Sequence, residues 1–364
     1  MKIFFAIKKL SSMGGAERVL CTICSELVSR GHDITIVSFD QKGTQPFYPL
    51  DGRVKRIDLG IGDSTNNTHL YSRLKALRRT VKQEQPEIVI GFMLSMIVPL
   101  AFALVGTGIP VLASEHIVAE HYRKRPLQYA LLKMASLYLS KITVLSEQIR
   151  KGYPESLRKK MVVMPNPVVT ASGKAQLDVI KPRYVLLNIG RLELQKDHST
   201  LIRSFGRISN IYPDWELKIF GEGSLRSELE NLIKSMGLEN RVHMPGITSQ
   251  IENEYCNADI FVISSHYEGF GLVTAEAMSY GLPVIGFEDC PGTNELIQDG
   301  YTGILATGSS DRVKALTCEL EKVLSDPALR MKLGDAAKAA IGSKFSIKYV
   351  GDLWEELLGN INSK

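Results

Sequence analysis

Cysteine is scarce in this sequence, with five residues among 364. An odd number of cysteines favours free thiols and a reducing compartment. Cys21 and Cys24 form a C-x-x-C pair within a predicted helix, but no second Cys or His pair completes a zinc site. We therefore predict that both are buried core residues. The opening MKIFFAIKKLSSMGG has too short an apolar part and too much glycine for a secretory signal peptide.

The sequence also lacks an unbroken membrane-spanning segment. Residues 88–114 carry no charge and are long enough to cross a bilayer. Glycine and proline, however, divide them into a strand at 88–92, an apolar helix at 95–105 and a strand at 111–113. This pattern is typical of the buried middle of an α/β sheet.

No class of residue dominates the composition. Apolar residues make up 44% and charged residues 23% of the chain, which excludes disordered, collagen-like and coiled-coil proteins. A length of 364 residues predicts two domains, each large enough for its own core.

The net charge of +5 hides an asymmetry. Residues 1–165 contain 24 Lys and Arg against 13 Asp and Glu, a charge of +11, and the remainder carries −6. Basic residues gather at 53–56, at 73–82 and at 123–125, and the last group precedes an apolar stretch at 127–139. The first half therefore predicts a surface for an anionic partner, such as membrane phosphates or nucleic acid, although scattered surface lysines would give the same charge.

Short apolar runs alternate with amphipathic stretches, which predicts βαβ units and parallel sheets. Prolines on both sides of Asn166 stop any helix or central strand and mark the boundary between two similar domains. We place the domains at 1–166 and 167–345, and a final helix at 346–364 can pack on either. The expected strands are 3–7, 34–39, 184–189, 217–220, 242–244, 260–263 and 283–286. The expected helices are 16–29, 70–83, 199–208 and 224–236.

Two glycines, Gly14 and Gly15, open the first predicted helix. They do not form the G-x-G-x-x-G pattern of dinucleotide-binding proteins, which argues against an oxidoreductase. Such glycines let the backbone approach an anion at a helix N-terminus, although a plain tight turn would look the same.

Charged residues follow two predicted strands of the second half. Arg191 and Lys196 supply a bidentate fork and a point charge suited to a diphosphate, with solvated surface charge as the alternative. Glu268 lies on a glycine-rich loop, and Glu276 lies about one turn into a helix that begins near Leu272. The loop amides can hold phosphate oxygens, while the carboxylates accept hydrogen bonds from sugar and ribose hydroxyls. Helix capping explains one glutamate but not both.

In their order and spacing, the motifs GGAE, GRxxxxK and EGFGLVTAE resemble the retaining family 4 glycosyltransferases of the GT-B type, over essentially the whole chain. The opening SxGGAERVL, the triplet at 114–116 (SEH) and the NPV after the linker make the chain similar to bacterial members that extend lipid-linked oligosaccharides, O-antigens or capsules. The resemblance implies two Rossmann-like parallel-sheet domains that face each other across a cleft. The first would bind the acceptor and the second the nucleotide sugar.

The resemblance also implies a role for each matching charged residue. Arg191 and Lys196 would neutralise the leaving diphosphate, to which Gly15 would lend a backbone amide. Glu276 would bind the ribose, and Glu268 would lie at the donor sugar.

Several further roles follow from the resemblance alone. Phe270, Gly271 and Leu272 would contribute backbone amides to the sugar and phosphate, and the turn at Gly221 would lie near the nucleotide, with a simple turn as its alternative. His116 would contact the donor sugar, or it would be a satisfied core histidine.

The chemistry of such an enzyme follows from charge. Negative charge builds on the diphosphate as the sugar–phosphate bond breaks, so fixed cations lower the barrier. Asp-x-Asp, the metal-binding signature of the other glycosyltransferase fold, is absent from the sequence, so we expect catalysis without a metal or other cofactor. Retention would arise by front-face attack or, less simply, through a covalent intermediate on Glu268.

The expected partners are a UDP-sugar or GDP-sugar carrying a hexose or N-acetylhexosamine, a polyprenyl-diphosphate-linked acceptor and the cytoplasmic face of the cell membrane, with no nucleic acid. Two alternatives remain open: a UDP-sugar epimerase of similar architecture, and a catalytically silent scaffold that binds sugar nucleotides.

Overall fold

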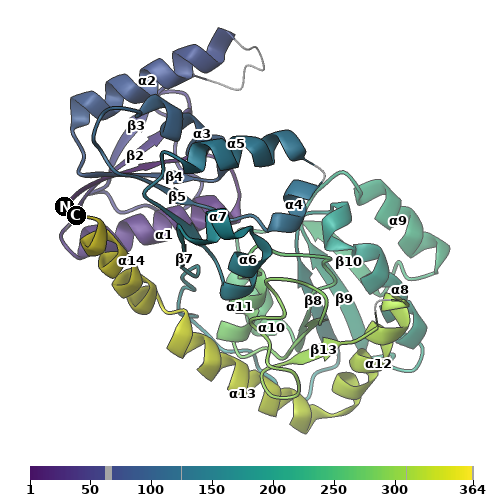
Figure 1. Cartoon of the computed structure of the whole chain (residues 1–364). Helices are drawn as coiled ribbons and strands as arrows, with labels where there is room; N and C mark the ends of the chain where they lie inside the picture. The colour runs from purple at the N-terminus through teal and green to yellow at the C-terminus, as the bar shows by residue number, and fades with distance from the viewer. Residues whose placement is uncertain (62–67, 124, 309, 363–364) are drawn as a thin grey trace. The chain divides into compact units, whose positions relative to one another are not determined.

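The computed structural model describes residues 1–61, 68–123, 125–308 and 310–362. Its chain divides into two compact units (Figure 1). The first consists of Met1–Pro167 together with Ile347–Lys364, and the second is Val168–Ser346. The proline-bracketed segment at 164–167 thus lies where the chain first leaves one unit for the other.

The described part of the first unit contains a seven-stranded sheet of order β3-β2-β1-β4-β5-β6-β7, with all neighbours parallel. The strands are β1 (Lys2–Ala6), β2 (Asp33–Ser38), β3 (Lys55–Asp58), β4 (Ile88–Phe92), β5 (Val111–Ser114), β6 (Lys141–Val144) and β7 (Met161–Val163). The helices are α1 (Gly15–Ser29), α2 (Thr68–Glu84), α3 (Leu94–Ala103), α4 (Ala119–Arg123), α5 (Pro126–Ser136), α6 (Glu147–Gly152), α7 (Glu155–Arg158) and α14 (Ile347–Asn362).

The uncharged segment at 88–114 forms β4, α3 and β5, as predicted. None of the helices that the structure describes combines the length and the apolar character needed to cross a membrane. Cys21 and Cys24 are buried on α1, as predicted for core residues, and burial raises the pKa of the Cys21 thiol to about 11.

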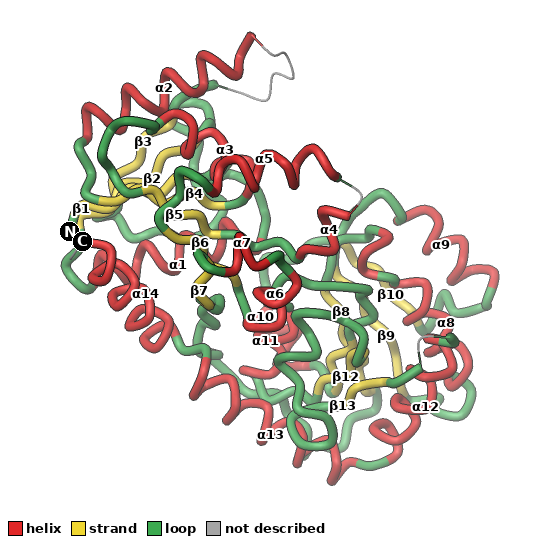
Figure 2. Tube along the Cα trace, in the orientation of Figure 1, coloured by secondary structure: helices red, strands yellow, loops and turns green. Residues whose placement is uncertain are grey.

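The last helix, α14, packs on the first unit. Figure 2 shows it beside α1. The ring of Trp354 is buried with its centroid 6.1 Å from that of Phe5 on β1. Arg30, at the end of α1, donates to carboxylates of Asp352 and Glu355 at 2.6 and 2.8 Å. The first unit is therefore built from two separate stretches of chain.

The described part of the second unit contains a six-stranded parallel sheet of order β10-β9-β8-β11-β12-β13. The strands are β8 (Tyr184–Ile189), β9 (Trp215–Phe220), β10 (Val242–Gly246), β11 (Ile260–Val262), β12 (Val284–Phe287) and β13 (Ile304–Ala306). The helical segments are η1 (Leu194–Lys196), α8 (His198–Ile208), α9 (Arg226–Ser235), α10 (Ile251–Asn257), α11 (Leu272–Ser279), α12 (Arg312–Ser325) and α13 (Pro327–Lys344). In both sheets the strand order reverses beside the first strand, at β1–β4 and at β8–β11, which is the place where doubly wound sheets bind ligands.

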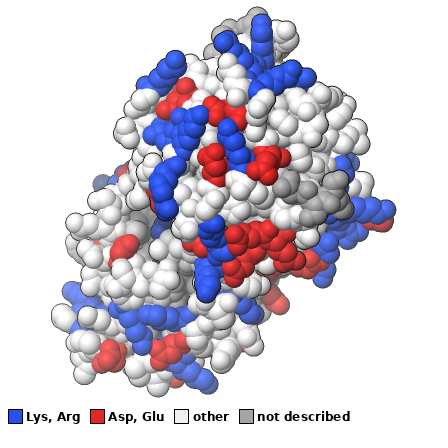
Figure 3. All heavy atoms as spheres, turned by 90° about the vertical axis from the view of Figure 1, so that its left-hand side faces the viewer, with Lys and Arg blue, Asp and Glu red and all other residues white. Residues whose placement is uncertain are grey.

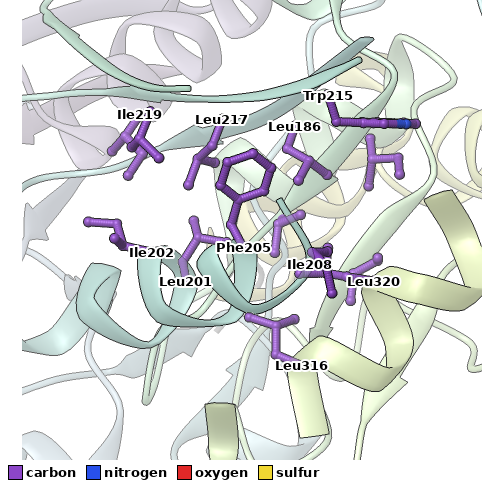
Figure 4. Close-up of a cluster of buried hydrophobic side chains, with 14 of the residues drawn as sticks. Leu186, Leu201, Ile202, Phe205, Ile208, Trp215, Leu217, Ile219, Leu316 and Leu320 are labelled. Carbon is purple, nitrogen blue, oxygen red and sulfur yellow. The ribbon is translucent and has the colours of Figure 1, made fainter. Parts of the chain in front are cut away.

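A buried apolar cluster fixes α8 on the second sheet (Figure 4). Apolar residues at helical spacing, Leu201, Phe205 and Ile208, point from α8 toward Leu186 on β8 and Leu217 on β9. Full burial of each such side chain contributes about 1.5–3 kcal/mol. Because α8 directly follows the turn that ends at Lys196, this packing also anchors the first candidate site residues.

Candidate functional site

Lys196 and Glu268 meet at the point where the strand order of the second sheet reverses. Lys196 ends the short turn η1 after β8, and Glu268 lies on the loop after β11. The ammonium of Lys196 donates to Glu268 Oε1 at 2.6 Å, and the two side chains are only 14% and 10% exposed. The loops after β8 and β11, the strands on either side of the reversal, thus bring a cation and a carboxylate into direct contact.

The loop around Glu268 holds its carboxylate firmly. The hydroxyl of Ser265 donates to the same Oε1 at 2.6 Å. The backbone N–H of Glu268 donates to the carbonyl of Pro291 at 2.9 Å. The next residue, Gly292, has φ +81°, and a Cβ there would lie 2.5 Å from the Glu268 carbonyl oxygen. Glycine is therefore required where the loop after β12 braces Glu268.

Glu276 lies on α11 and is 5% exposed. The hydroxyl of Tyr255, a buried residue of α10, donates to Glu276 Oε2 at 3.0 Å. The sequence analysis did not identify Tyr255, because nothing local distinguishes it from any core aromatic. Neither Glu268 nor Glu276 caps α11, whose N-cap is Gly271 without a side-chain hydrogen bond. Capping therefore accounts for neither glutamate.

The start of α11 presents open backbone amides. Within the described residues, the N–H groups of Phe270, Gly271 and Leu272 donate no hydrogen bond. Gly271 has φ +77°, which favours glycine. The side chain of Phe270 instead belongs to the core, with its ring 5.3 Å from that of Phe345. The backbone of this segment is thus free to meet an anion while its aromatic ring anchors it.

Arg191 is exposed, and its guanidinium has no hydrogen-bond or ion-pair partner within the parts of the chain that the structure describes. Its loop is held by the turn at Gly221, where a Cβ would lie 2.0 Å from the carbonyl oxygen of Gly190. The N–H of Leu192 donates to the carbonyl of Glu222 at 3.0 Å. The loops after β8 and β9 therefore lie in direct backbone contact. This close approach explains why position 221 must be glycine.

In the first unit, Gly15 is the first residue of α1. The carboxylate of Glu17 folds back over this helix end, where it accepts a hydrogen bond from the Ser12 hydroxyl at 2.7 Å. A Cβ on Gly14 would overlap the same carboxylate. The positive end of the α1 dipole thus carries a negative charge of its own chain.

His116 follows β5, and its ring pairs with a hydroxyl of that strand. His116 Nε2 lies 3.0 Å from Ser114 Oγ, which also accepts a hydrogen bond from the Thr143 hydroxyl at 3.1 Å. Nε2 accepts from Ser114 if the ring proton is on Nδ1 and donates to it if the proton is on Nε2. Burial lowers the pKa of His116 to about 4, which keeps the ring neutral near pH 7. The ring also lies 5.0 Å from that of Phe92.

The preceding residue, Glu115, is 1% exposed. Its carboxyl group accepts hydrogen bonds from the Ile117 N–H at 3.0 Å and the Tyr122 hydroxyl at 2.9 Å. Burial outweighs these contacts and raises its pKa to about 7. The sequence analysis treated Glu115 only as part of a motif.

The candidate residues follow a strand or open a helix at the carboxyl-end edge of their own sheet, except Glu276, which lies one turn into α11. Lys196 and Glu268 are in direct contact. Glu276 contacts Tyr255, and the Arg191 side chain has no polar partner among the described residues. In the described ranges, no group of three or more His, Cys, Asp and Glu side chains is placed to hold a metal ion.

Two family models match the chain, one after the other. The model described as Glycosyltransferase Family 4 matches residues 13–172, and the model described as Glycosyl transferases group 1 matches residues 172–340. An uncharacterized glycosyltransferase of Haemophilus influenzae is 26% identical over 98% of this chain and 99% of its own length. A Campylobacter jejuni alpha-1,4-N-acetyl-D-galactosaminyltransferase, named for a PP-undecaprenol-linked substrate, is 28% identical over 100% of this chain and 99% of its own length.

Solved structures share the fold over the whole chain. Sucrose-phosphate synthase from Thermosynechococcus elongatus has a TM-score of 0.87 and 18% identity, and covers 100% of this chain and 99% of its own. Anabaena Alr3699/HepE in complex with UDP and glucose has a TM-score of 0.83 and 19% identity, and covers 99% of this chain and 100% of its own. Both likenesses show the same two-sheet architecture.

Proposed function

Because this chain belongs to the family 4 glycosyltransferases of the GT-B type, we propose that it moves a hexose or N-acetylhexosamine from a UDP-sugar to a polyprenyl-diphosphate-linked glycan, with retention of configuration. The observation that carries this proposal is the buried Lys196–Glu268 contact beside the open amides of α11. The names of relatives support it, since one acts on a PP-undecaprenol-linked glycan and one neighbour binds UDP and glucose.

The second unit supplies the groups that a nucleotide diphosphate needs. Arg191 and Lys196 would neutralise the leaving diphosphate together with the N–H groups that begin α11. Glu276, oriented by Tyr255, would accept hydrogen bonds from the ribose hydroxyls. Glu268 would accept one from a donor-sugar hydroxyl. The ammonium of Lys196 already lies against a carboxylate, so a bound diphosphate replaces one negative partner with a more highly charged one.

Front-face attack explains retention without a further group. The bond between the sugar C1 and the diphosphate oxygen breaks, and the acceptor oxygen bonds to C1 on the same face. The acceptor hydroxyl proton passes to the departing phosphate oxygen, which therefore acts as the base. A covalent intermediate on Glu268 is the less simple route, because it needs two successive displacements at the sugar C1.

The first unit would contribute two donors. If the Ser114 hydroxyl donates to Nε2, a neutral His116 would present Nδ1–H to a sugar hydroxyl at pH 7. The amide of Gly15 would reach a phosphate only if the Glu17 carboxylate moves away from the start of α1.

The central experiment is a panel of nucleotide sugars, UDP- and GDP-linked, incubated with and without an undecaprenyl-diphosphate-linked acceptor. We expect release of UDP that depends on the acceptor, and a product whose anomeric proton coupling matches the donor. Loss of the nucleotide sugar without UDP release and without acceptor would favour the epimerase alternative. Binding of UDP without any turnover would favour the scaffold.

A metal-free reaction is the finer part of the proposal. The fixed cations Arg191 and Lys196 would stabilise the negative charge on the leaving diphosphate, as a divalent ion does in other enzymes that use nucleotide sugars. We therefore expect the same turnover with and without excess EDTA. Loss of activity that Mg²⁺ or Mn²⁺ restores would contradict this part alone.

The membrane surface is proposed as a partner on the basis of α5. Leu127 and Met134 of this helix and its C-cap residue Leu137 are 73%, 54% and 74% exposed. Arg125 and Lys133 lie exposed beside them. Lys124, part of the predicted basic group, lies outside the described residues. An exposed apolar strip flanked by cations fits the headgroup region of an anionic bilayer. This supports peripheral docking, and we propose the cytoplasmic face because nucleotide sugars and the polyprenyl-linked acceptor of the proposed reaction would meet there.

A second basic group lies on α2. Figure 3 shows Lys and Arg side chains gathered over this helix at the upper end of the molecule. Lys75, Arg79 and Lys82 are exposed there, whereas Arg78 donates to the carbonyls of Ala103 and Val105. Among the side chains of α2 that the structure describes, Tyr71 is exposed, but it has no exposed aliphatic neighbours like those on α5.

A further inference from the structure

Arg312 is the first residue of α12 and directly follows the N-cap Asp311. A cation at this position opposes the helix dipole, whose positive end lies there. The side chain is nevertheless only 13% exposed, and its guanidinium carbon lies 3.6 Å from the ring centroid of Phe287. Burying a charge is unfavourable unless it is paired, and Arg312 has polar partners on two sides.

On one side, Arg312 holds the loop that carries Glu268. Its Nη2 donates to the carbonyl oxygens of Ser264 and Ser265, at 2.9 and 3.1 Å. The hydroxyl of Ser265 in turn donates to Glu268 Oε1 at 2.6 Å. Arg312 therefore fixes the backbone three and four residues before Glu268.

On the other side, Arg312 reaches the residue after Lys196. Its Nε lies 3.5 Å from Asp197 Oδ2. Asp197 is held at φ +48°, a conformation that is unfavourable for a non-glycine residue, and its carboxylate caps α8 by accepting from the Thr200 N–H. A third partner, Asp289, accepts from Nη1 at 2.6 Å.

We propose that Arg312 is a positioning residue that clamps the loops after β8 and β11 together and so keeps Lys196 and Glu268 in register for a diphosphate. Only the identity of that ligand rests on the proposed function. The planar guanidinium with its several donors can serve both loops at once, whereas a lysine ammonium cannot span the same partners. An Arg312→Lys variant therefore keeps the charge and removes the clamp.

Arg330 on α13 provides a matched control. It is 4% exposed, its Nη1 donates to the carbonyls of Val323 and Leu324, and its guanidinium lies 5.2 Å from the ring of Trp215. Trp215 is the first residue of β9, so Arg330 lies at the edge of the sheet opposite the candidate site. Arg330→Lys loses the same kinds of contact without touching either loop.

The test compares Arg312→Lys with Arg330→Lys in the full chain. The readouts are the thermal midpoint, amide hydrogen exchange and UDP affinity by calorimetry. We expect both variants to lower the midpoint. Only Arg312→Lys should speed exchange in both 194–198 and 264–268 and weaken UDP binding about tenfold or more. If Arg312→Lys does not fold, Asp289→Asn, which removes one exposed partner, should show the same pattern to a smaller degree.

Unchanged exchange in either loop, or equal effects of the two arginine variants on exchange and UDP affinity, would overturn the clamp. A wild-type chain that does not bind UDP would instead contradict the UDP-sugar proposal. In that case the exchange data still decide whether Arg312 joins the two loops.

Discussion

Glu115 and His116 are neighbours in the chain, and burial moves their pKa values in opposite directions, to about 7 for the carboxyl group and to about 4 for the imidazole. Both shifts favour the uncharged form. Each side chain also takes part in its own hydrogen bonds, with Tyr122 in one case and Ser114 in the other. Between these two pKa values the end of β5 carries little charge.

Glu115→Gln should stabilise the protein relative to wild type as pH rises. The raised pKa of Glu115 means that its stability contribution is complete below about pH 4.5 and is lost as pH rises through about 7. A glutamine cannot ionise, so we expect a relative gain of about 2–3 kcal/mol between pH 5 and 8. Protonation of His116 lowers the free energy of unfolding at low pH. It does so equally in wild type and in Glu115→Gln, so it cancels from the difference between them.

Urea unfolding followed by Trp354 fluorescence in a Trp215→Phe background measures this gain in the first unit. Glu155→Gln, at an exposed ion pair with Lys159, serves as the control and should show no such trend. A difference between variant and wild type that does not change with pH would show that Glu115 is charged throughout.

Ser114→Ala tests whether the Ser114 hydroxyl donates to His116 Nε2 and so keeps the ring proton on Nδ1. We expect this direction, because the Thr143 hydroxyl already donates to Ser114 Oγ and leaves the Ser114 proton for Nε2. Ring ¹⁵N chemical shifts of His116 should therefore move toward a mixture of tautomers, and turnover should fall about tenfold if Nδ1–H contacts the donor sugar. Thr143→Val is the milder companion variant. Lower turnover with an unchanged ¹⁵N spectrum would show that Ser114 acts by another route.

Arg191→Ala and Lys196→Ala should each reduce turnover by about 2–4 kcal/mol of transition-state stabilisation. Lys181→Ala is a suitable control, because Lys181 pairs with the buried Asp259 at 2.8 Å before β11, at the other edge of the sheet. This control should lose stability but keep its turnover. Turnover within about threefold of wild type for both site variants would rule out the diphosphate role.

Replacing Leu127, Met134 and Leu137 by aspartate should abolish binding to vesicles that contain phosphatidylglycerol. Both the apolar contact of α5 and its attraction to anionic lipid are lost. Wild type should pellet with these vesicles and less so at high salt, whose shorter Debye length screens the cations. Replacing Lys75, Arg79 and Lys82 on α2 by serine is the control. If only this α2 variant loses binding, α5 is not the docking face.

Most of the fold could be predicted from the sequence, because apolar runs and the glycines and prolines that interrupt them are local signals. The strand at 184–189 matches β8, and the helix at 199–208 differs from α8 by one residue. The charged strand β3 was missed, because it lies at the sheet edge where half-exposed residues need no apolar alternation. The strands β6, β7 and β13 are too short to show a period.

The site was predictable only where a motif is continuous. Glu268 and Glu276 fall within one eleven-residue segment of the sequence, and the helix begins at Leu272 as predicted. Tyr255 and Arg312 act on that segment from distant parts of the chain, so no spacing rule finds them. Arg312 offered one local hint, a cation placed against the helix dipole.

The helix α14 gives the first unit an unusual history during synthesis. Its Trp354 fills the space beside Phe5, yet the ribosome makes it only after the whole second unit. N-terminal domains generally fold first as they emerge. Here the first sheet can form early, but its apolar surface under α14 stays uncovered until the chain returns at Ile347. If synthesis stalls within the second unit, the first unit therefore leaves apolar surface exposed to chaperones and proteases, although it was synthesised first.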